Sequence, residues 1–281
     1  MARHKKPRLE NDKNWCANSA TAKTIAVNST ESARPQRNVG LARAISKMGY
    51  CSRNRAEEAI RAGRVRVNGA MRRNVEAPVH LGKDRVEIDG HEIKKAEKIY
   101  LMLNKPRGVV TTANDERGRE TIYSFLEKYN DGFLNWIAPV GRLDKASEGL
   151  LLLTNDSEWA AKITAPETRV DKIYHVQIAG QATPAMIEKL QSGLAVKDGE
   201  FLRVNRASVI RSGERNCWLE IVLDEGRNRH IRRMFETIGV EVLRLIRVAI
   251  GELSLGNLPK GEVRALSEQE RLLLFRKANG D

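Results

Sequence analysis

The stretch Pro139–Asp156 reads PVGRLDKASEGLLLLTND and joins a turn-rich segment to a short apolar run. Residues 150–154 have the length of a strand and follow turn residues, which is typical of a strand buried on both faces. We therefore expect a buried strand here, with the side chains of the preceding turn placed at the mouth of that strand.

The chain on either side of this stretch mixes strand-like runs with helical stretches. The other strands that we expect are Ile99–Leu103, Val109–Thr112, Ile173–Ile178, Leu219–Leu223 and Val242–Val248. The helices that we expect cover residues 121–128, 157–163, 184–192 and about 229–238. They follow no regular βαβ alternation, so they predict an α+β domain around an antiparallel or mixed sheet. We place this domain at residues 97–270, followed by a C-terminal tail at 271–281.

Residues 38–96 have the features of a separate small domain. Apolar residues at helical spacing predict a first helix that ends at Gly49: Leu41, Ala44, Ile45 and Met48. Ser52 offers an N-cap for a second helix, which carries Ala56, Ala59 and Ile60 on one face. Asn68-Gly69 then gives the strongest two-residue hairpin signal, and Asp89-Gly90 follows a second alternating run.

The charge balance points to a polyanionic partner. The chain has 49 Lys and Arg against 36 Asp and Glu, a net charge of +13. Such a field attracts RNA, DNA or an anionic membrane. Aromatic residues make up only 5%, and no long basic amphipathic helix with aromatic anchors is visible, which disfavours the membrane surface. The apolar runs are far too short to span a bilayer, and residues 1–37 are expected to form a flexible basic tail.

Several kinds of chemistry find no support in the sequence. The five His residues are dispersed, and the three Cys residues lack metal-ligand spacing. An odd number of unpaired thiols is typical of a cytoplasmic protein. No Gly-rich phosphate loop, dinucleotide-binding fingerprint or nucleophile elbow is present. We therefore expect no metal and no other cofactor.

One carboxylate remains as a catalytic candidate. Asp144 stands in the turn between Arg142 and Lys145, and neighbouring cations favour its ionised form. An ionised carboxylate can act as nucleophile, base or electrostatic stabiliser. By spacing alone, however, an aspartate at such a place is more often a turn or capping residue.

Two further segments can reach a polyanionic substrate. Residues 224–234, DEGRNRHIRRM, predict a basic helix that Asn228 caps, with Arg229, Arg232 and Arg233 opposite an apolar stripe. An arginine there can bind a carboxylate or an RNA phosphate, although a solvated basic face explains the run equally well. Tyr174, near the start of a strand, can stack on a base, although a lone tyrosine in a strand is more often part of the core.

Four segments taken together resemble the RsuA-like branch of the pseudouridine synthases, ribosomal-RNA enzymes that commonly carry an N-terminal S4 RNA-binding domain. The first is the S4 signature, CSRNRA at 51–56 and GRVRVNG at 63–69. The others are LNKPRG at 103–108, GRLD at 141–144 with GLLLLTND at 149–156, and EGRNR at 225–229. The resemblance covers about residues 38–265.

The resemblance implies a role for individual residues. Asp144 matches the catalytic aspartate, Tyr174 the tyrosine that packs against the target base, and Arg232 the basic residue that pairs with the aspartate. The residues expected to contact the substrate beside them are Arg142, Ile231 and Arg229. The reaction would flip a uridine out of the RNA, break its glycosidic bond and rejoin the base through C5. No cofactor is required.

The resemblance also implies partners. The expected substrate is ribosomal RNA or a ribosomal subunit precursor, with 23S RNA favoured over 16S RNA and with the enzyme acting as a monomer in the cytoplasm. Residues 38–95 hold 13 Lys and Arg against 7 Asp and Glu, which suits recognition of folded RNA through its backbone. The RNA-binding residues that we expect in this domain are Arg43, Lys47, Arg53, Arg55, Arg61, Arg64 and Arg66. The main alternative is a non-catalytic S4-type RNA-binding or ribosome-assembly protein, which would have no reason to assemble Asp144, Tyr174 and Arg232.

Overall fold

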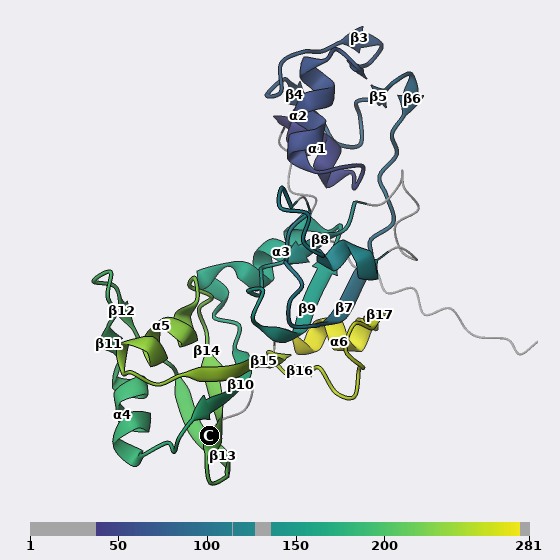
Figure 1. Cartoon of the computed structure of the whole chain (residues 1–281). Helices are drawn as coiled ribbons and strands as arrows, with labels where there is room; N and C mark the ends of the chain where they lie inside the picture. The colour runs from purple at the N-terminus through teal and green to yellow at the C-terminus, as the bar shows by residue number, and fades with distance from the viewer. Residues whose placement is uncertain (1–37, 114, 127–135, 276–281) are drawn as a thin grey trace, which may run out of the picture. The chain divides into compact units, whose positions relative to one another are not determined.

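The computed structural model describes residues 38–113, 115–126 and 136–275 (Figure 1). The predicted N-terminal tail, the end of the predicted helix at 121–128 and most of the predicted C-terminal tail lie outside the described residues. Among the described residues, no helix combines the length and the apolar character needed to cross a bilayer.

Residues 38–96 fold as two helices and a small sheet. The helices are α1 (Leu41–Lys47) and α2 (Arg53–Arg61), and the Ser52 hydroxyl caps α2 by accepting the Arg55 N–H at 3.3 Å. The sheet has the order β3-β2-β5-β6, made of Ala70–Met71, Val65–Val67, Val86–Ile88 and His91–Glu92. A separate pair joins β1 (Val39–Gly40) to β4 (Pro78–Val79).

The turns of this small domain confirm the sequence signals. Gly49 has φ +79° directly after the C-cap of α1. Asn68 and Gly69 both have positive φ, 51° and 80°, as a two-residue hairpin turn with the right twist requires. Asp89 and Gly90 repeat this conformation between β5 and β6. The predicted helices and hairpins are therefore confirmed.

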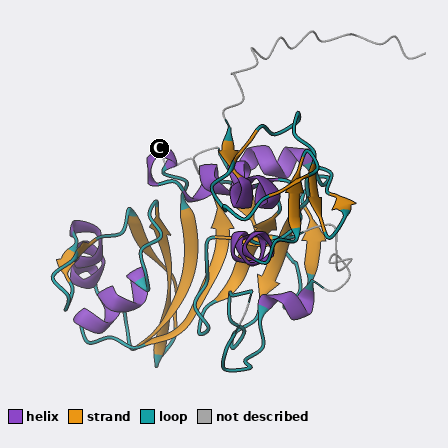
Figure 2. Ribbon diagram, turned by 90° about the horizontal axis from the view of Figure 1, so that it is seen from above, coloured by secondary structure: helices purple, strands orange, loops and turns teal. Residues whose placement is uncertain are grey.

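The larger part of the chain is built on one mixed sheet (Figures 1 and 2). Its main path is β13-β14-β10-β15-β9-β7-β17, with β16 paired to β15 and β8 to β9. The strands are β7 (Tyr100–Lys105), β8 (Ala138–Val140), β9 (Glu148–Thr154), β10 (Lys172–Ala179), β13 (Arg206–Ser212), β14 (Asn216–Leu223), β15 (Val242–Ile250), β16 (Leu253–Ser254) and β17 (Val263–Ala265). Strands β15 and β9 run parallel and the other pairs are antiparallel, which confirms the α+β class with a mixed sheet.

Helices and short turns flank this sheet. They are α3 (Ser157–Thr164), α4 (Pro184–Ser192), α5 (His230–Thr237), α6 (Glu268–Leu273) and the 3-10 turns Ile122–Phe125 and Pro166–Thr168, with a hairpin of β11 (Leu194–Ala195) and β12 (Phe201–Leu202) before β13. Helices α4 and α5 pack on the β10–β14 half through Leu190, Met234 and Phe235, which are fully buried. The helices expected at 157–163, 184–192 and 229–238 are confirmed, and α6 crosses the predicted boundary at 270.

Strand β9 is the central strand of the core. All seven of its residues are buried, and its leucines alternate between two apolar clusters, Leu151 and Leu153 on one face and Leu150 and Leu152 on the other. This confirms the prediction of a strand buried on both faces. The turn that carries Asp144 leads directly into β9.

Two sequence predictions differ from the structure. Val109–Thr112 is not a strand, because only Val110 makes an isolated bridge, to Thr121. Val109 and Val110 are buried, while the Thr111 hydroxyl bonds to the Leu143 backbone, so the run packs as a loop and not as part of a ladder. The helix expected at 121–128 is a single 3-10 turn within its described part, Ile122–Phe125.

Candidate active site

A cleft of about 570 Å³ opens beside the turn between β8 and β9. Its walls come from that turn, from β10, from the β14–α5 loop and from β15. Five of the six residues predicted for the active site line it: Arg142, Asp144, Tyr174, Arg229 and Ile231. Segments separated by almost ninety positions in the sequence therefore meet around one carboxylate.

A buried lysine binds the backbone of the turn that carries Asp144. Lys105, at the end of β7, has no exposed surface, and its Nζ donates to the backbone oxygens of Pro106, Asp144 and Ser147 at 3.0, 3.2 and 2.9 Å. Burial lowers the pKa of Lys105 to about 8, against the opposing attraction of Asp144 and Glu148. The ammonium thus fixes the backbone of this turn.

Further hydrogen bonds hold the same turn. The Thr111 hydroxyl donates to the Leu143 oxygen at 2.8 Å, and the Gly108 N–H donates to the Lys145 oxygen at 2.8 Å. Leu143 itself is only 6% exposed and is anchored in the apolar cluster that includes Leu151. Asp144 is therefore carried on a turn with little freedom, which is the preorganisation that a catalytic group needs.

Arg232 lies behind the turn and contacts its backbone. Its Nη2 donates to the Ala146 oxygen at 3.0 Å, and its Nη1 donates to the Val242 oxygen at 3.3 Å. Burial lowers the pKa of Arg232, and the charge of Arg229 adds to this, while the Asp144 carboxylate acts in the opposite direction. The guanidinium is thus within electrostatic reach of Asp144, but within the described part of the chain no salt bridge joins the two.

The segment before α5 departs from the predicted cap. The N-cap is Arg229 and not Asn228, and it makes no side-chain cap bond. Arg229 has φ +48° and ψ +30°, a left-handed conformation that costs energy for a side chain of this kind, and its exposed side chain lines the cleft. Asn68, Asp89 and Arg169 also have positive φ, so the backbone conformation alone assigns no role to Arg229.

The predicted basic face of α5 is divided among different partners. Arg233 forms ion pairs with Asp198 and Glu200 of the β11–β12 hairpin. Arg227 pairs with Glu200 at 2.7 Å and with Glu225 at 2.5 Å. Arg233 thus joins the hairpin to the helix, and Arg227 joins it to the loop before the helix. Arg229 lines the cleft, and Arg232 contacts the turn.

Part of the cleft lining is apolar. Tyr174 contacts both apolar clusters that meet at the cleft, and Ile231 is only 3% exposed. Leu245 and Ile250 of β15 complete this part of the lining. A flat unsaturated ring fits between such side chains, because aromatic and aliphatic walls exclude water from both of its faces.

Three cations that line the cleft were not predicted from the sequence to be site residues: Lys172, Arg227 and Arg247. Of these, Arg247 is only 5% exposed. Lys105, Lys172 and Arg247 each lie within or at the end of a strand rich in apolar residues, where a charge needs a specific partner.

The arginines expected to bind RNA in the small domain differ in their surroundings. Arg43, Arg53 and Arg55 are exposed on or beside α1 and α2, and Lys47 is half-buried. Arg61 pairs with Glu57 at 2.7 Å, Arg64 pairs with Asp89, and Arg66 donates to the Gly69 oxygen at 3.0 Å. The structure thus brings these basic side chains to one small domain, with three of them engaged in local contacts.

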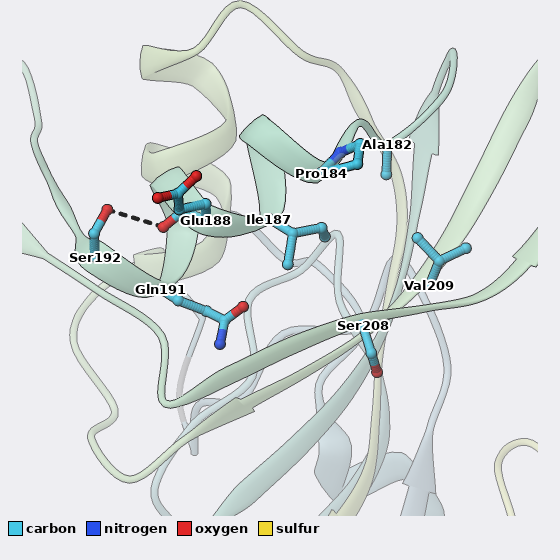
Figure 3. Close-up of a pocket in the computed structure, with 8 residues that line it drawn as sticks. All are labelled: Ala182, Pro184, Ile187, Glu188, Gln191, Ser192, Ser208 and Val209. Atoms are coloured by element: carbon cyan, nitrogen blue, oxygen red, sulfur yellow. Dashed lines mark hydrogen bonds between the residues drawn. The ribbon is translucent and has the colours of Figure 1, made fainter.

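A second cavity lies between α4 and β13 (Figure 3). Small and aliphatic side chains such as Ala182, Ile187 and Val209 line much of it, and Ser192 turns back to donate to the Glu188 backbone oxygen at 2.8 Å. It contains none of the predicted site residues. Among the described residues, no group of three or more His, Cys, Asp or Glu side chains is arranged to hold a metal ion.

Comparison with known proteins places the chain in a family. The model for RNA pseudouridylate synthases matches residues 99–237, and the model for the S4 domain matches residues 39–86. Ribosomal large subunit pseudouridine synthase B of Bacillus subtilis is 35% identical over 231 residues, which is 82% of this chain and 93% of that protein. An uncharacterized RNA pseudouridine synthase of Aquifex aeolicus is 36% identical over 233 residues, 83% of this chain and 92% of that protein.

A solved structure agrees with these relatives. The crystal structure of a pseudouridylate synthase is 28% identical and superimposes with a TM-score of 0.60, covering 84% of this chain and 99% of that one. The resemblance found in the sequence motifs is therefore confirmed over both domains. The chain belongs to the family of RNA pseudouridine synthases that carry an N-terminal S4 domain.

Proposed function

We propose that this protein isomerises a specific uridine of ribosomal RNA, of the large subunit in preference to the small one, with Asp144 as the catalytic residue. The observation that carries the proposal is the convergence of Asp144, Arg142, Tyr174, Arg229 and Ile231 on one cleft. The choice of the large subunit is supported by the relative from Bacillus subtilis, whose name assigns it that substrate. We further propose that the enzyme acts as a monomer in the cytoplasm.

The cleft suits a nucleotide that has left its helix. Flipping a uridine costs a few kcal/mol of lost stacking and pairing. Exposed Arg142 and Arg229 stand at the cleft, where they can bind the phosphates beside the flipped nucleotide. Tyr174 and Ile231 then enclose the uracil. Contact with these two side chains helps to retain the freed base while it rotates.

Asp144 acts on the enclosed nucleotide. Its carboxylate attacks the base or the ribose, or removes a ribose proton, and the C1′–N1 bond breaks. The uracil rotates and its C5 bonds to C1′, while Asp144 leaves its covalent adduct or returns the ribose proton. C5 then loses its proton and N1 takes one up. In this proposal Arg232 holds the turn that carries the carboxylate, through its hydrogen bond to the Ala146 oxygen.

The test is a map of pseudouridines in ribosomal RNA from cells with and without this protein. Carbodiimide labelling followed by primer extension reports each pseudouridine as a stop. One stop in large-subunit RNA is expected to disappear without the protein and to return when the wild-type gene is restored. Identical maps in ribosomal RNA from both strains would contradict the proposal.

The non-catalytic alternative gives a different result in the same experiment. A ribosome-assembly protein would change the amounts of the subunits and leave the pseudouridine map unchanged. The geometry of the Asp144 turn favours catalysis over this alternative, since a purely RNA-binding surface gains nothing from burying Lys105 to fix one carboxylate-bearing turn.

A further inference from the structure

Arg247, in β15, is a buried cation with an unused donor. Its Nε donates to the Leu150 oxygen at 2.7 Å, whereas its Nη2 is buried and has no hydrogen-bond partner among the described residues. Leaving a buried charged donor without an acceptor costs free energy, so native proteins rarely retain one without a reason. Arg247 lines the cleft of Asp144, where a substrate can supply the missing acceptor.

The sheet places Arg247 next to the predicted base-binding residue. In the β10–β15 register Arg247 lies opposite Tyr174, and in the β15–β9 register it lies opposite Gly149. Side chains of directly opposed residues share one face of a sheet. The strands approach closely here, since a Cβ on Gly149 would lie 2.3 Å from the Arg247 oxygen. Arg247 thus stands between the tyrosine and the strand that follows the Asp144 turn.

A second cation stands beside Arg247. Lys172 is two residues before Tyr174 in β10, so both side chains project from the same face, and Lys172 also lines the cleft. Its Nζ donates to the Asp224 oxygen at 2.9 Å. Burial lowers the pKa of Lys172 and the charge of Arg247 lowers it further, while the carboxylates of Asp224, Asp171 and Glu225 act in the opposite direction. Lys172 and Arg247 thus line the same cleft and add positive charge to it.

The reaction itself generates an anion. When the C1′–N1 bond breaks heterolytically, the electron pair stays on N1 and is delocalised over O2 and O4 of the uracil. C5 later bonds to C1′ and loses its proton, and N1 takes up a proton, so charge accumulates on the base only while it is detached. Donors fixed in advance in a water-excluding site stabilise such transient charge most effectively.

We propose that Arg247, assisted by Lys172, binds the uracil oxygens and stabilises the negative charge of the detached base. This inference rests on the proposed function. Arg247 is buried, whereas Arg142 and Arg229 are exposed. Arg247 is therefore assigned to the base, which enters the cleft, and Arg142 and Arg229 to the backbone phosphates, which stay outside it.

Single-turnover kinetics on the identified RNA test this role. Arg247→Gln and Lys172→Met are expected to slow pseudouridine formation, Arg247→Gln by about 100-fold or more, as for the loss of one fixed donor to a developing anion. RNA affinity, measured by fluorescence anisotropy, is expected to stay within about threefold. Arg211→Gln, on the exposed strand β13, is the matched control and should change neither quantity.

A second readout separates binding of the base from a structural role. Arg247→Ala leaves space for a free guanidinium ion, so millimolar guanidinium should restore part of its single-turnover rate, while urea, its neutral analogue, should not. A folded Arg247→Gln enzyme with a rate within about threefold of wild type would overturn the inference. Equal failure of guanidinium and urea to rescue Arg247→Ala would overturn it too.

The remaining outcomes are also decisive. If the Arg247 variants do not fold, Lys172→Met decides, and an unchanged rate for it refutes the inference. Failure of the proposed function is distinguishable, because the wild-type protein would then form no pseudouridine in ribosomal RNA. If the wild-type protein is active, Asp144→Asn is inactive and the Arg247 variants are unaffected, only the role of Arg247 is refuted.

Discussion

Lys105 is a buried cation that binds the backbone of the turn carrying Asp144. A charged ammonium with no exposed surface is unfavourable unless acceptors surround it, and here three backbone oxygens do so. Two of those oxygens belong to Asp144 and Ser147, within the turn that leads into β9. The cost of burying Lys105 is therefore tied to the position of Asp144.

The lowered pKa of Lys105 predicts a pH dependence of stability. Its folded-state pKa of about 8 lies below the usual lysine value of 10.5, so between these values the unfolded chain binds more protons at this lysine. The contribution of Lys105 to the free energy of unfolding therefore rises with pH between these two values. The free energy of unfolding of wild type relative to Lys105→Met is expected to rise by about 1–3 kcal/mol between pH 8 and 10.5.

Urea denaturation at several pH values measures the difference in unfolding free energy between wild type and Lys105→Met. At neutral pH, Lys105→Met should also form pseudouridine at least about tenfold more slowly than wild type, because the turn loses the donor that fixes it. Lys83→Met, at an exposed lysine of the small domain, is the reference for the pH series. A stability difference that falls as pH rises would contradict the assignment.

At the scale of the elements, the close approach of β9 and β15 shapes the cleft. Gly149 has φ +101°, and an added Cβ would meet the oxygen of Arg247 at 2.3 Å and its nitrogen at 2.9 Å. Gly149→Ala must therefore push two central strands apart, in addition to straining its own backbone. Gly108 has nearly the same φ, +98°, and nothing within 4 Å of its added Cβ.

These two glycines form a matched pair. Gly108→Ala should cost about 1–2 kcal/mol of unfolding free energy for the left-handed backbone alone. Gly149→Ala should cost about 1–3 kcal/mol more, from the steric clash between strands. Thermal and denaturant unfolding measure both. Equal losses for the two variants would show that the β9–β15 contact is not tightly packed.

The elements show which features a sequence pattern can predict. The leucines of β9, the Ser52 cap and the Asn68-Gly69 turn are local signals, and the structure confirms them. Val109–Thr112 has the composition of a strand, but Thr111 donates its hydroxyl to Leu143, a contact between residues 32 positions apart. Strand β13 was not predicted, because its last five residues are all exposed. Its sequence therefore does not alternate between apolar and polar residues.

The candidate site was predictable only through the resemblance of its motifs. By spacing alone Asp144 is an ordinary turn residue, and no local sequence pattern predicts which residues lie beside it in the cleft. Arg247 was missed because a register between strands β10 and β15 puts it beside Tyr174, and pairing of distant strands leaves no local trace. Arg229 as N-cap of α5 was likewise hidden, since Asn228 is the better capping residue by type.

At the scale of the whole molecule, net charge and the S4 domain predict salt-dependent RNA binding. Removing one phosphate-binding cation should reduce the slope of log affinity against log salt by about 0.7–0.9. The double variant Arg53→Gln with Arg55→Gln removes two exposed cations of α2 and should reduce the slope by up to about 1.8. Filter binding over a range of salt concentrations gives the slope.

The control for this prediction comes from the same domain. Arg61 and Arg64 have carboxylate partners in Glu57 and Asp89, so replacing both by Gln should change the slope less. Catalytic rate at saturating RNA should stay near wild type in both double variants. A slope that is unchanged without Arg53 and Arg55 would mean that the RNA is bound elsewhere.

The cleft is proposed to use the Asp144 carboxylate to isomerise uridine. Asp144→Asn keeps the size and the backbone contacts of this residue but removes its charge. Purified wild-type and Asp144→Asn proteins, incubated with the target RNA and assayed by carbodiimide labelling and primer extension, give the most direct test. We predict a pseudouridine stop with wild type and none with Asp144→Asn, at RNA affinities equal within about threefold. A stop of equal strength with both proteins would contradict the catalytic role of Asp144.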